Sequence, residues 1–149
     1  MSELIQHTHS RDSIRSFLYG ILEAGWQTFA FIVAIRYFNS DINFKAFIAA
    51  AGPIGFLLTP LSLYFFANKK FTASFACASV YFLTALFLFG SIAVNSLAVF
   101  GACIIISQII NVQKGPVLLQ IYTTNYPQKN RGHYMKMPHI LSAISAVPF

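Results

Sequence analysis

The longest charge-free run places the strongest constraint on this chain. Residues 71–113 are 43 consecutive positions without an Asp, Glu, Lys or Arg. As a single α-helix this run would be about 65 Å long, roughly twice the thickness of the hydrocarbon core of a bilayer. We therefore expect two membrane-spanning helices here, separated by the polar Val-Asn-Ser break at residues 94–96.

The composition agrees with a membrane protein. The chain is 56% hydrophobic and 9% charged, whereas roughly 25% of the residues of a soluble domain are charged. Its net charge of +6 does not indicate nucleic-acid binding, because the basic residues lie in short segments between apolar runs. Cys77 and Cys103 lie inside apolar runs and are expected to be small buried side chains, not a disulfide or a metal site.

The apolar runs predict an all-α polytopic fold in the inner or plasma membrane, with the lipid bilayer as a partner. The expected spans are residues 17–38, 46–67, 71–94 and 97–121, followed by a partial fifth span at 138–149. Residues 1–16 are expected to form a disordered or interfacial cytoplasmic tail, and residues 122–137 a basic loop. Lys and Arg collect on the cytoplasmic side of membranes. A cytoplasmic N-terminus places seven of them inside, and only Arg36 and Lys45 outside.

Polar residues inside two of these spans are the candidate functional residues. They are Glu23 and Gln27 in the first span, and Gln108, Asn111 and Lys114 in the fourth. Polar groups inside a membrane helix cost free energy, so they usually face a cavity or a partner helix. We expect these residues to line a cavity for a substrate or a coupling ion. The alternative for the first span is a helix that packs through small residues.

Glu23 and Lys114 form a predicted ion pair. With both helix ends cytoplasmic, each residue would lie about 10 Å below that surface at 1.5 Å per residue. Opposite charges at one depth are better explained as partners than as separate burials. The alternative is that Lys114 extends its long side chain to the interface while Glu23 is buried without a charge.

No enzyme is predicted from this sequence. It has no phosphate-binding Gly-rich loop, no zinc-ligand spacing and no Gly-x-Ser-x-Gly turn, which are the patterns that signal common enzyme chemistries. Four acidic residues leave little for catalysis by paired carboxylates. We expect no cofactor and no metal, since His7 and His9 alone are weak evidence for a metal site.

Two short motifs are expected on the cytoplasmic side. They are the basic turn Lys69 and Lys70, and the loop residues Tyr126, Pro127, Arg131 and Gly132. Pro127 should help to end the fourth span, because proline cannot continue the helix hydrogen-bond ladder. Arg131 should bind helix-end carbonyls or acidic headgroups, and Gly132 should let the loop pass close to a neighbour.

These motifs, the short loops and the cytoplasmic N-terminus together resemble the first part of a major facilitator superfamily transporter. The resemblance covers residues 16–149, although residues 60–70 keep only the basic pair of that family's signature between its second and third helices. It implies inverted repeats and a cavity lined by the first and fourth helices. The implied function is that of a symporter or antiporter, a secondary active transporter that moves a small solute by alternating access, coupled to protons or another ion.

The resemblance also implies a fragment that ends within its fifth helix, with the remainder of the transporter as a partner. Two alternatives stay open. One is a small four-helix proton-coupled exporter that acts as a dimer and uses Glu23 as its lone membrane glutamate. The other is a membrane scaffold that does not transport, or a remnant of a transporter.

Overall fold

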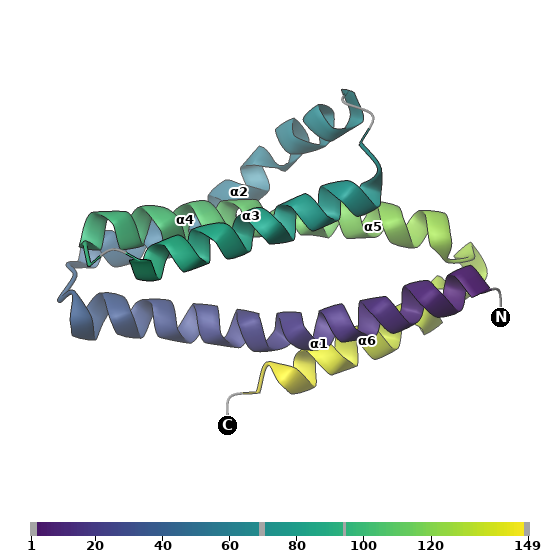
Figure 1. Cartoon of the computed structure of the whole chain (residues 1–149), viewed down its shortest axis with the longest axis horizontal. Coiled ribbons are helices and arrows are strands. Elements are labelled where there is room, and N and C mark those ends of the chain that lie inside the picture. The colour runs from purple at the N-terminus through teal and green to yellow at the C-terminus, as the bar shows by residue number, and fades with distance from the viewer. Residues whose placement is uncertain (1–2, 69–70, 94, 148–149) are drawn as a thin grey trace. The chain divides into compact units, whose positions relative to one another are not determined.

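The computed structural model describes residues 3–68, 71–93 and 95–147, and this part of the chain is helical without a β-strand (Figure 1). The elements in chain order are α1 (Glu3–Ile32), η1 (Val33–Tyr37), α2 (Ile42–Asn68), α3 (Ala73–Ala93), α4 (Leu97–Val112), α5 (Lys114–Asn125), η2 (Gln128–Asn130) and α6 (Arg131–Ser145). Of these, η1 is a π-helical turn and η2 is a 3₁₀ turn.

Four helices in the described part of the chain are long and apolar enough to cross a membrane. They cover Glu3–Tyr37, Ile42–Phe66, Ala73–Ala93 and Leu97–Asn125. The prediction of an all-helical chain with four such helices is therefore confirmed. The side of the membrane on which the N-terminus lies stays a prediction.

The first helix begins earlier than the sequence suggested. Residues 3–16, expected as a disordered or interfacial tail, are the first turns of α1. No Gly or Pro interrupts them, and two of their polar side chains, Asp12 and Ser16, are buried. After η1 the chain turns at Asn39, whose φ of 48° lies in the left-handed region that asparagine tolerates.

The fourth span is divided into two helices. The helix breaks at Gln113. Its backbone N–H donates to the carbonyl oxygen of Ile110, three residues earlier, at 3.0 Å, so this turn is tighter than an α-helical turn. Pro116 lies three residues later and has no N–H to donate to the preceding turn. This missing donor explains why α4 stops and α5 starts within one apolar run.

The region expected as a basic loop is mostly helical. α5 continues to Asn125, and α6 starts at Arg131, so the expected loop at 122–137 is reduced to the few residues around η2. Pro138, the expected start of the partial fifth span, is buried inside α6. A proline inside a helix is tolerated where neighbouring elements supply packing.

The chain forms two compact units. One consists of Met1–Ile32 with Tyr122–Phe149, and the other is Val33–Ile121. In the first unit α6 packs along α1 (Figure 1). Gly20 makes this close approach possible, because a Cβ at that position would overlap with Ser145 Oγ and with the carbonyl of Ser142.

The second unit packs α4 against both α2 and α3. Its core joins Ala76 and Cys77 of α3 to Val117 of α5, and partly buried side chains such as Tyr81 pack around them. On the other side, Gly55 of α2 lies so close to α4 that a Cβ would come within 3.1 Å of Ile109 Cα.

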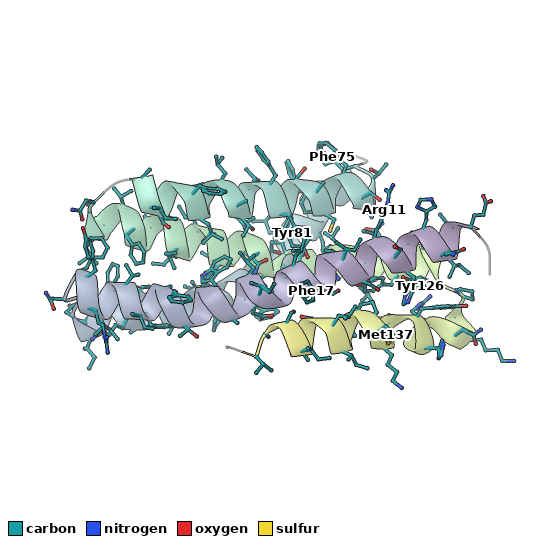
Figure 2. The ribbon with its side chains drawn as sticks, turned by 60° about the horizontal axis from the view of Figure 1, so that its bottom comes forward. Arg11, Phe17, Phe75, Tyr81, Tyr126 and Met137 are labelled. Carbon is teal, nitrogen blue, oxygen red and sulfur yellow. The ribbon has the colours of Figure 1, made fainter. Side chains whose placement is uncertain are left out.

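Large apolar side chains cover much of the outside of both units (Figure 2). Leu57, Phe89 and Ile92 are 80%, 74% and 82% exposed. Large exposed apolar surface marks an interaction with a partner or a membrane.

Candidate functional site

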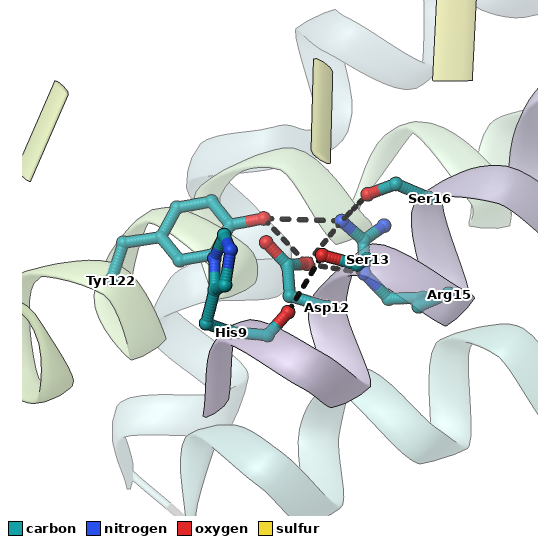
Figure 3. A network of polar contacts seen from close by, with 6 residues as sticks. All are labelled: His9, Asp12, Ser13, Arg15, Ser16 and Tyr122. Carbon is teal, nitrogen blue, oxygen red and sulfur yellow. Dashed lines mark hydrogen bonds and ion pairs between the residues drawn. The ribbon is translucent and has the colours of Figure 1, made fainter. Parts of the chain in front are cut away.

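A buried polar network joins α1 to the end of α5 in the first unit (Figure 3). Arg15 Nε and Nη2 donate to Asp12 Oδ1 at 2.9 and 2.6 Å. The Tyr122 hydroxyl donates to the same oxygen at 2.9 Å and accepts a hydrogen bond from Arg15 Nη2 at 3.1 Å. Tyr122 therefore bridges the ion pair from a position 110 residues along the chain from Asp12.

Helical spacing produces this arrangement. Asp12, Arg15 and Ser16 lie within about one turn of α1 and so share a face, and Arg15 Nη2 also donates to Ser16 Oγ at 2.9 Å. The Asp12 side chain is only 6% exposed, whereas that of Arg15 is 24% exposed. A buried carboxylate is tolerated when it is paired and hydrogen-bonded, and Arg15 and Tyr122 supply both conditions.

Aromatic rings extend the network into the loop and α6. The ring of Tyr126 stacks on Tyr122 at 5.7 Å between centroids and on Tyr134 at 5.2 Å. His9 of α1 lies edge-on to Tyr134 at 6.3 Å. Ring pairs at these separations are favourable, so the three tyrosines fix the chain between α5 and α6 against the polar end of α1.

Several buried polar atoms beside the network have no hydrogen-bond partner among the described residues. They are Asp12 Oδ2, His9 Nδ1, the Tyr126 hydroxyl and Arg131 Nε. Burial raises the pKa of Tyr126 to about 12, the negative charge of Asp12 adds to this effect, and Arg15 opposes it. Unpaired buried polar atoms are where a protein holds an ordered water or another polar group, so the network can accept a further hydrogen-bonding group.

A second polar junction joins α2 to the break between α4 and α5. Gln113 Nε2 donates to the carbonyl oxygens of Gly55 at 2.7 Å and Ile109 at 3.1 Å. Its Oε1 accepts a hydrogen bond from the Ser62 hydroxyl at 2.6 Å. Gln113 is buried, and its amide is thus bonded on both sides.

The predicted cavity residues of α4 and α5 lie close together. Lys114 Nζ donates to Asn111 Oδ1 at 3.3 Å, and Gln108 lies one turn earlier on α4. All of these side chains are half-buried. Ser107, on the same side of α4 as Asn111, is fully buried and donates to the carbonyl of Ile104.

The predicted cavity residues of the first span are in the other unit. Glu23 is half-buried on α1, and the side chain of Gln27 lies outside what the structure describes. Because Glu23 and Lys114 belong to different units, their predicted ion pair stays a prediction.

The structure places most of the predicted loop motif. Tyr126 is buried at 2% exposure, Pro127 precedes η2, and Arg131 Nη2 donates to the carbonyl of Thr123 at 3.3 Å. The helix-end contact expected of Arg131 is therefore confirmed. The close approach expected at Gly132 is wrong, because a Cβ there would meet no described atom within 4 Å. Lys69 and Lys70 lie outside the described residues.

Sequence reasoning missed the Asp12–Arg15–Tyr122 network, since it assigned residues 1–16 to a disordered or interfacial tail. The spacing of Asp12 and Arg15, three residues apart, was the signal that could have revealed it, because such pairs are neighbours on a helix. Within the described ranges, no group of three or more His, Cys, Asp or Glu is placed to hold a metal.

No protein family, curated protein or solved structure matches this chain. The function is therefore inferred from its residues and their geometry.

Proposed function

We propose that this protein is a multi-pass integral membrane protein and forms part of a secondary active transporter for a small solute. The observation that carries the proposal is the pair Asn111 and Lys114, which are bonded to each other within the apolar helical segment Leu97–Asn125. An ionisable residue within a membrane helix faces a pathway or a partner far more often than lipid.

The exposed surface supports the membrane location. The outward side chains of α2 and α3 include Leu57 and Phe89, which are mostly exposed. A lipid environment removes the penalty that water would impose on this surface.

The helix break supports the transport role. Lys114 opens α5 immediately after the interruption at Gln113. Transporters often bind their substrates and coupling ions where a membrane helix is interrupted, because the freed backbone groups and the helix ends can contact the ligand. Here the interruption and the polar pair fall at the same place in the chain.

The family proposed is the major facilitator superfamily. Its support is the loop pattern of Tyr126, Pro127, Arg131 and Gly132, with the basic turn Lys69 and Lys70. Under this proposal Gln108 joins Asn111 and Lys114 in lining the cavity, and Asp12 with Arg15 holds the cytoplasmic end of the first helix.

A screen of small solutes tests the proposal. The purified full chain in detergent is melted in the presence of a panel of sugars, amino acids, organic acids and cations. A ligand that binds only the folded state stabilises it, by about 2.7 kcal/mol at a hundred times its dissociation constant. We expect at least one solute to raise the melting temperature of the wild type.

Variants decide whether the binding site is the proposed one. Asn111→Ala, Lys114→Met and Gln108→Ala should melt cooperatively but lose the ligand-induced shift. Gln128→Ala, a matched glutamine change at an exposed position of η2, should keep it. If no solute stabilises the wild type, or if the cavity variants respond like Gln128→Ala, the proposed site is rejected.

A further inference from the structure

We propose that the basic end of the α1–α6 pair binds the headgroup of an acidic phospholipid, while the apolar continuation of both helices contacts its acyl chains. This inference rests on the membrane location in the proposed function. It adds a second ligand, an acidic phospholipid, and places it on a surface of α1 and α6 that is separate from the proposed solute cavity.

The charge on this surface is mostly positive. Residues 122–147 contain no Asp or Glu, and the side chains of Lys129, Lys136, His133 and His139 are exposed. Arg11 is exposed on the neighbouring helix α1, whereas Asp12 is buried and already paired with Arg15. Glu3, in the first turn of α1, is also exposed. The exposed Arg11, Lys129 and Lys136 outnumber it, so the surface at this end has a net positive charge, which favours an anionic partner.

The exposed side of α6 divides into two sectors. At 100° per residue, Lys136 and His139 fall in one sector, and Met137, Ile140 and Ile144 fall in the next, which also holds His133 in the first turn of the helix. The three apolar side chains are 48%, 39% and 63% exposed. A helix with adjacent cationic and apolar sectors is typical of one that lies against the boundary between headgroups and acyl chains.

On α1 an exposed cationic side chain is likewise followed by exposed apolar ones, although Leu4 in the first turn is also exposed. Arg11 is exposed, and it is followed by Ile14, Phe17 and Leu18 at 61%, 44% and 59% exposure. Figure 2 shows Arg11 and Phe17 on α1 and Met137 on α6.

The two helices run in the same direction. His9 contacts Tyr134 near the start of both, and Gly20 meets Ser142 further along. The cationic residues near the start of α1 therefore lie beside those near the start of α6, and the apolar residues that follow on each helix lie beside each other. A free phosphate would use the cations alone, whereas a phospholipid matches both zones in this order, since its acidic headgroup joins directly to acyl chains.

Lipid titration of the full chain provides the test. The detergent-solubilised protein is titrated with phosphatidylglycerol or with phosphatidylcholine of the same acyl chains, and native mass spectrometry gives the association constant of the first bound lipid. We expect phosphatidylglycerol to bind more tightly, and added salt to reduce the difference. The double variant Lys129→Gln with Lys136→Gln should lower its constant by up to about twenty-five-fold, at about five-fold per basic residue near an acidic headgroup.

A matched double variant controls for the loss of net charge. Arg36→Gln with Lys45→Gln removes the same charge from residues of the other unit and should leave the phosphatidylglycerol constant unchanged. Equal constants for the two lipids, or an equal loss in both double variants, would overturn the headgroup site.

Flotation with phosphatidylcholine vesicles tests the membrane location separately from the headgroup site. A chain that floats and resists carbonate extraction, yet shows no preference for phosphatidylglycerol, rejects the headgroup site and leaves the membrane location standing. A chain that does not insert into these vesicles rejects both.

Discussion

At the scale of single residues, one hydroxyl connects distant parts of the first unit. Tyr122 Oη is bonded to both members of the Asp12–Arg15 pair. Tyr122→Phe keeps the ring and its stacking on Tyr126 but removes both hydrogen bonds. Since hydrogen bonds to charged groups contribute about 1.5–3 kcal/mol, we expect the free energy of unfolding to fall by about that amount, measured by denaturant titration in detergent.

Tyr64→Phe is the matched control for this change. Its side chain is 67% exposed on α2, so removal of its hydroxyl should alter stability by less than about 0.5 kcal/mol. Equal stability of the two variants would show that the bridge at Tyr122 adds nothing to the ion pair.

The phenol of Tyr126 gives a spectroscopic prediction. Its pKa is raised from 10.0 to about 12, because burial disfavours the phenolate and the Asp12 charge adds to this. A raised folded-state pKa means that Tyr126 stabilises the fold fully below pH 10 and loses this contribution as the pH rises towards 12. The absorbance difference at about 295 nm between the wild type and Tyr126→Phe should titrate near pH 12, and a midpoint near pH 10 would contradict the buried site.

Helical spacing alone identifies one pair of neighbours that was not predicted as a bonded pair, while the ion pair predicted between Lys114 and Glu23 stays a prediction. Asn111 and Lys114 are three residues apart on helical sequence, and the structure joins their side chains. The role of Gln113 could not be predicted, because its partners Gly55 and Ser62 are more than fifty residues away along the chain. No local pattern states which helix will lie opposite a given side chain.

At the scale of elements, small residues set the distance between helices. Gly55→Ala would place a Cβ at 3.1 Å from Ile109 Cα and Val112 Cβ. This overpacking should destabilise the second unit by about 1–3 kcal/mol. We expect a lower melting temperature and reduced protection of α4 amides in hydrogen exchange.

Gly52→Ala is the control on the same helix. No described atom lies within 4 Å of a Cβ at this position, and alanine in a helix interior is favoured over glycine by about 1 kcal/mol. This variant should be as stable as the wild type or more stable. If Gly55→Ala behaves in the same way, α2 does not approach α4 as closely as the structure places it.

Element identity was easier to predict than element boundaries. Long apolar runs predicted the four membrane-length helices, because a span needs about twenty consecutive apolar residues. The predicted helix starts were wrong where contacts with other helices stabilise a polar segment as helix. α1 continues through polar residues whose side chains pack in the Asp12 network, and α6 begins at Arg131, before the apolar run that was expected to start it.

At the scale of the whole molecule, the basic residues predict an orientation. Fusions of a topology reporter after Asn68 and Asn130 should report a cytoplasmic position, and fusions after Asp41 and Asn95 an external one, because Lys and Arg are retained on the cytoplasmic side. The activities of paired alkaline phosphatase and green fluorescent protein fusions measure this. An external signal at Asn130 would contradict both the number of spans and the proposed family.

The contact between α1 and the end of α5 also has a consequence for the order of folding. Asp12 and Tyr122 are separated by 110 residues, so a ribosome that adds about 5–20 residues per second needs about 5–20 s to supply the partner. The helices of the second unit are synthesised within that interval and can pack first. Until Tyr122 is synthesised, the carboxylate of Asp12 is paired with Arg15 alone. The packing of residues 122–147 against α1 is therefore a late event in the folding of the protein.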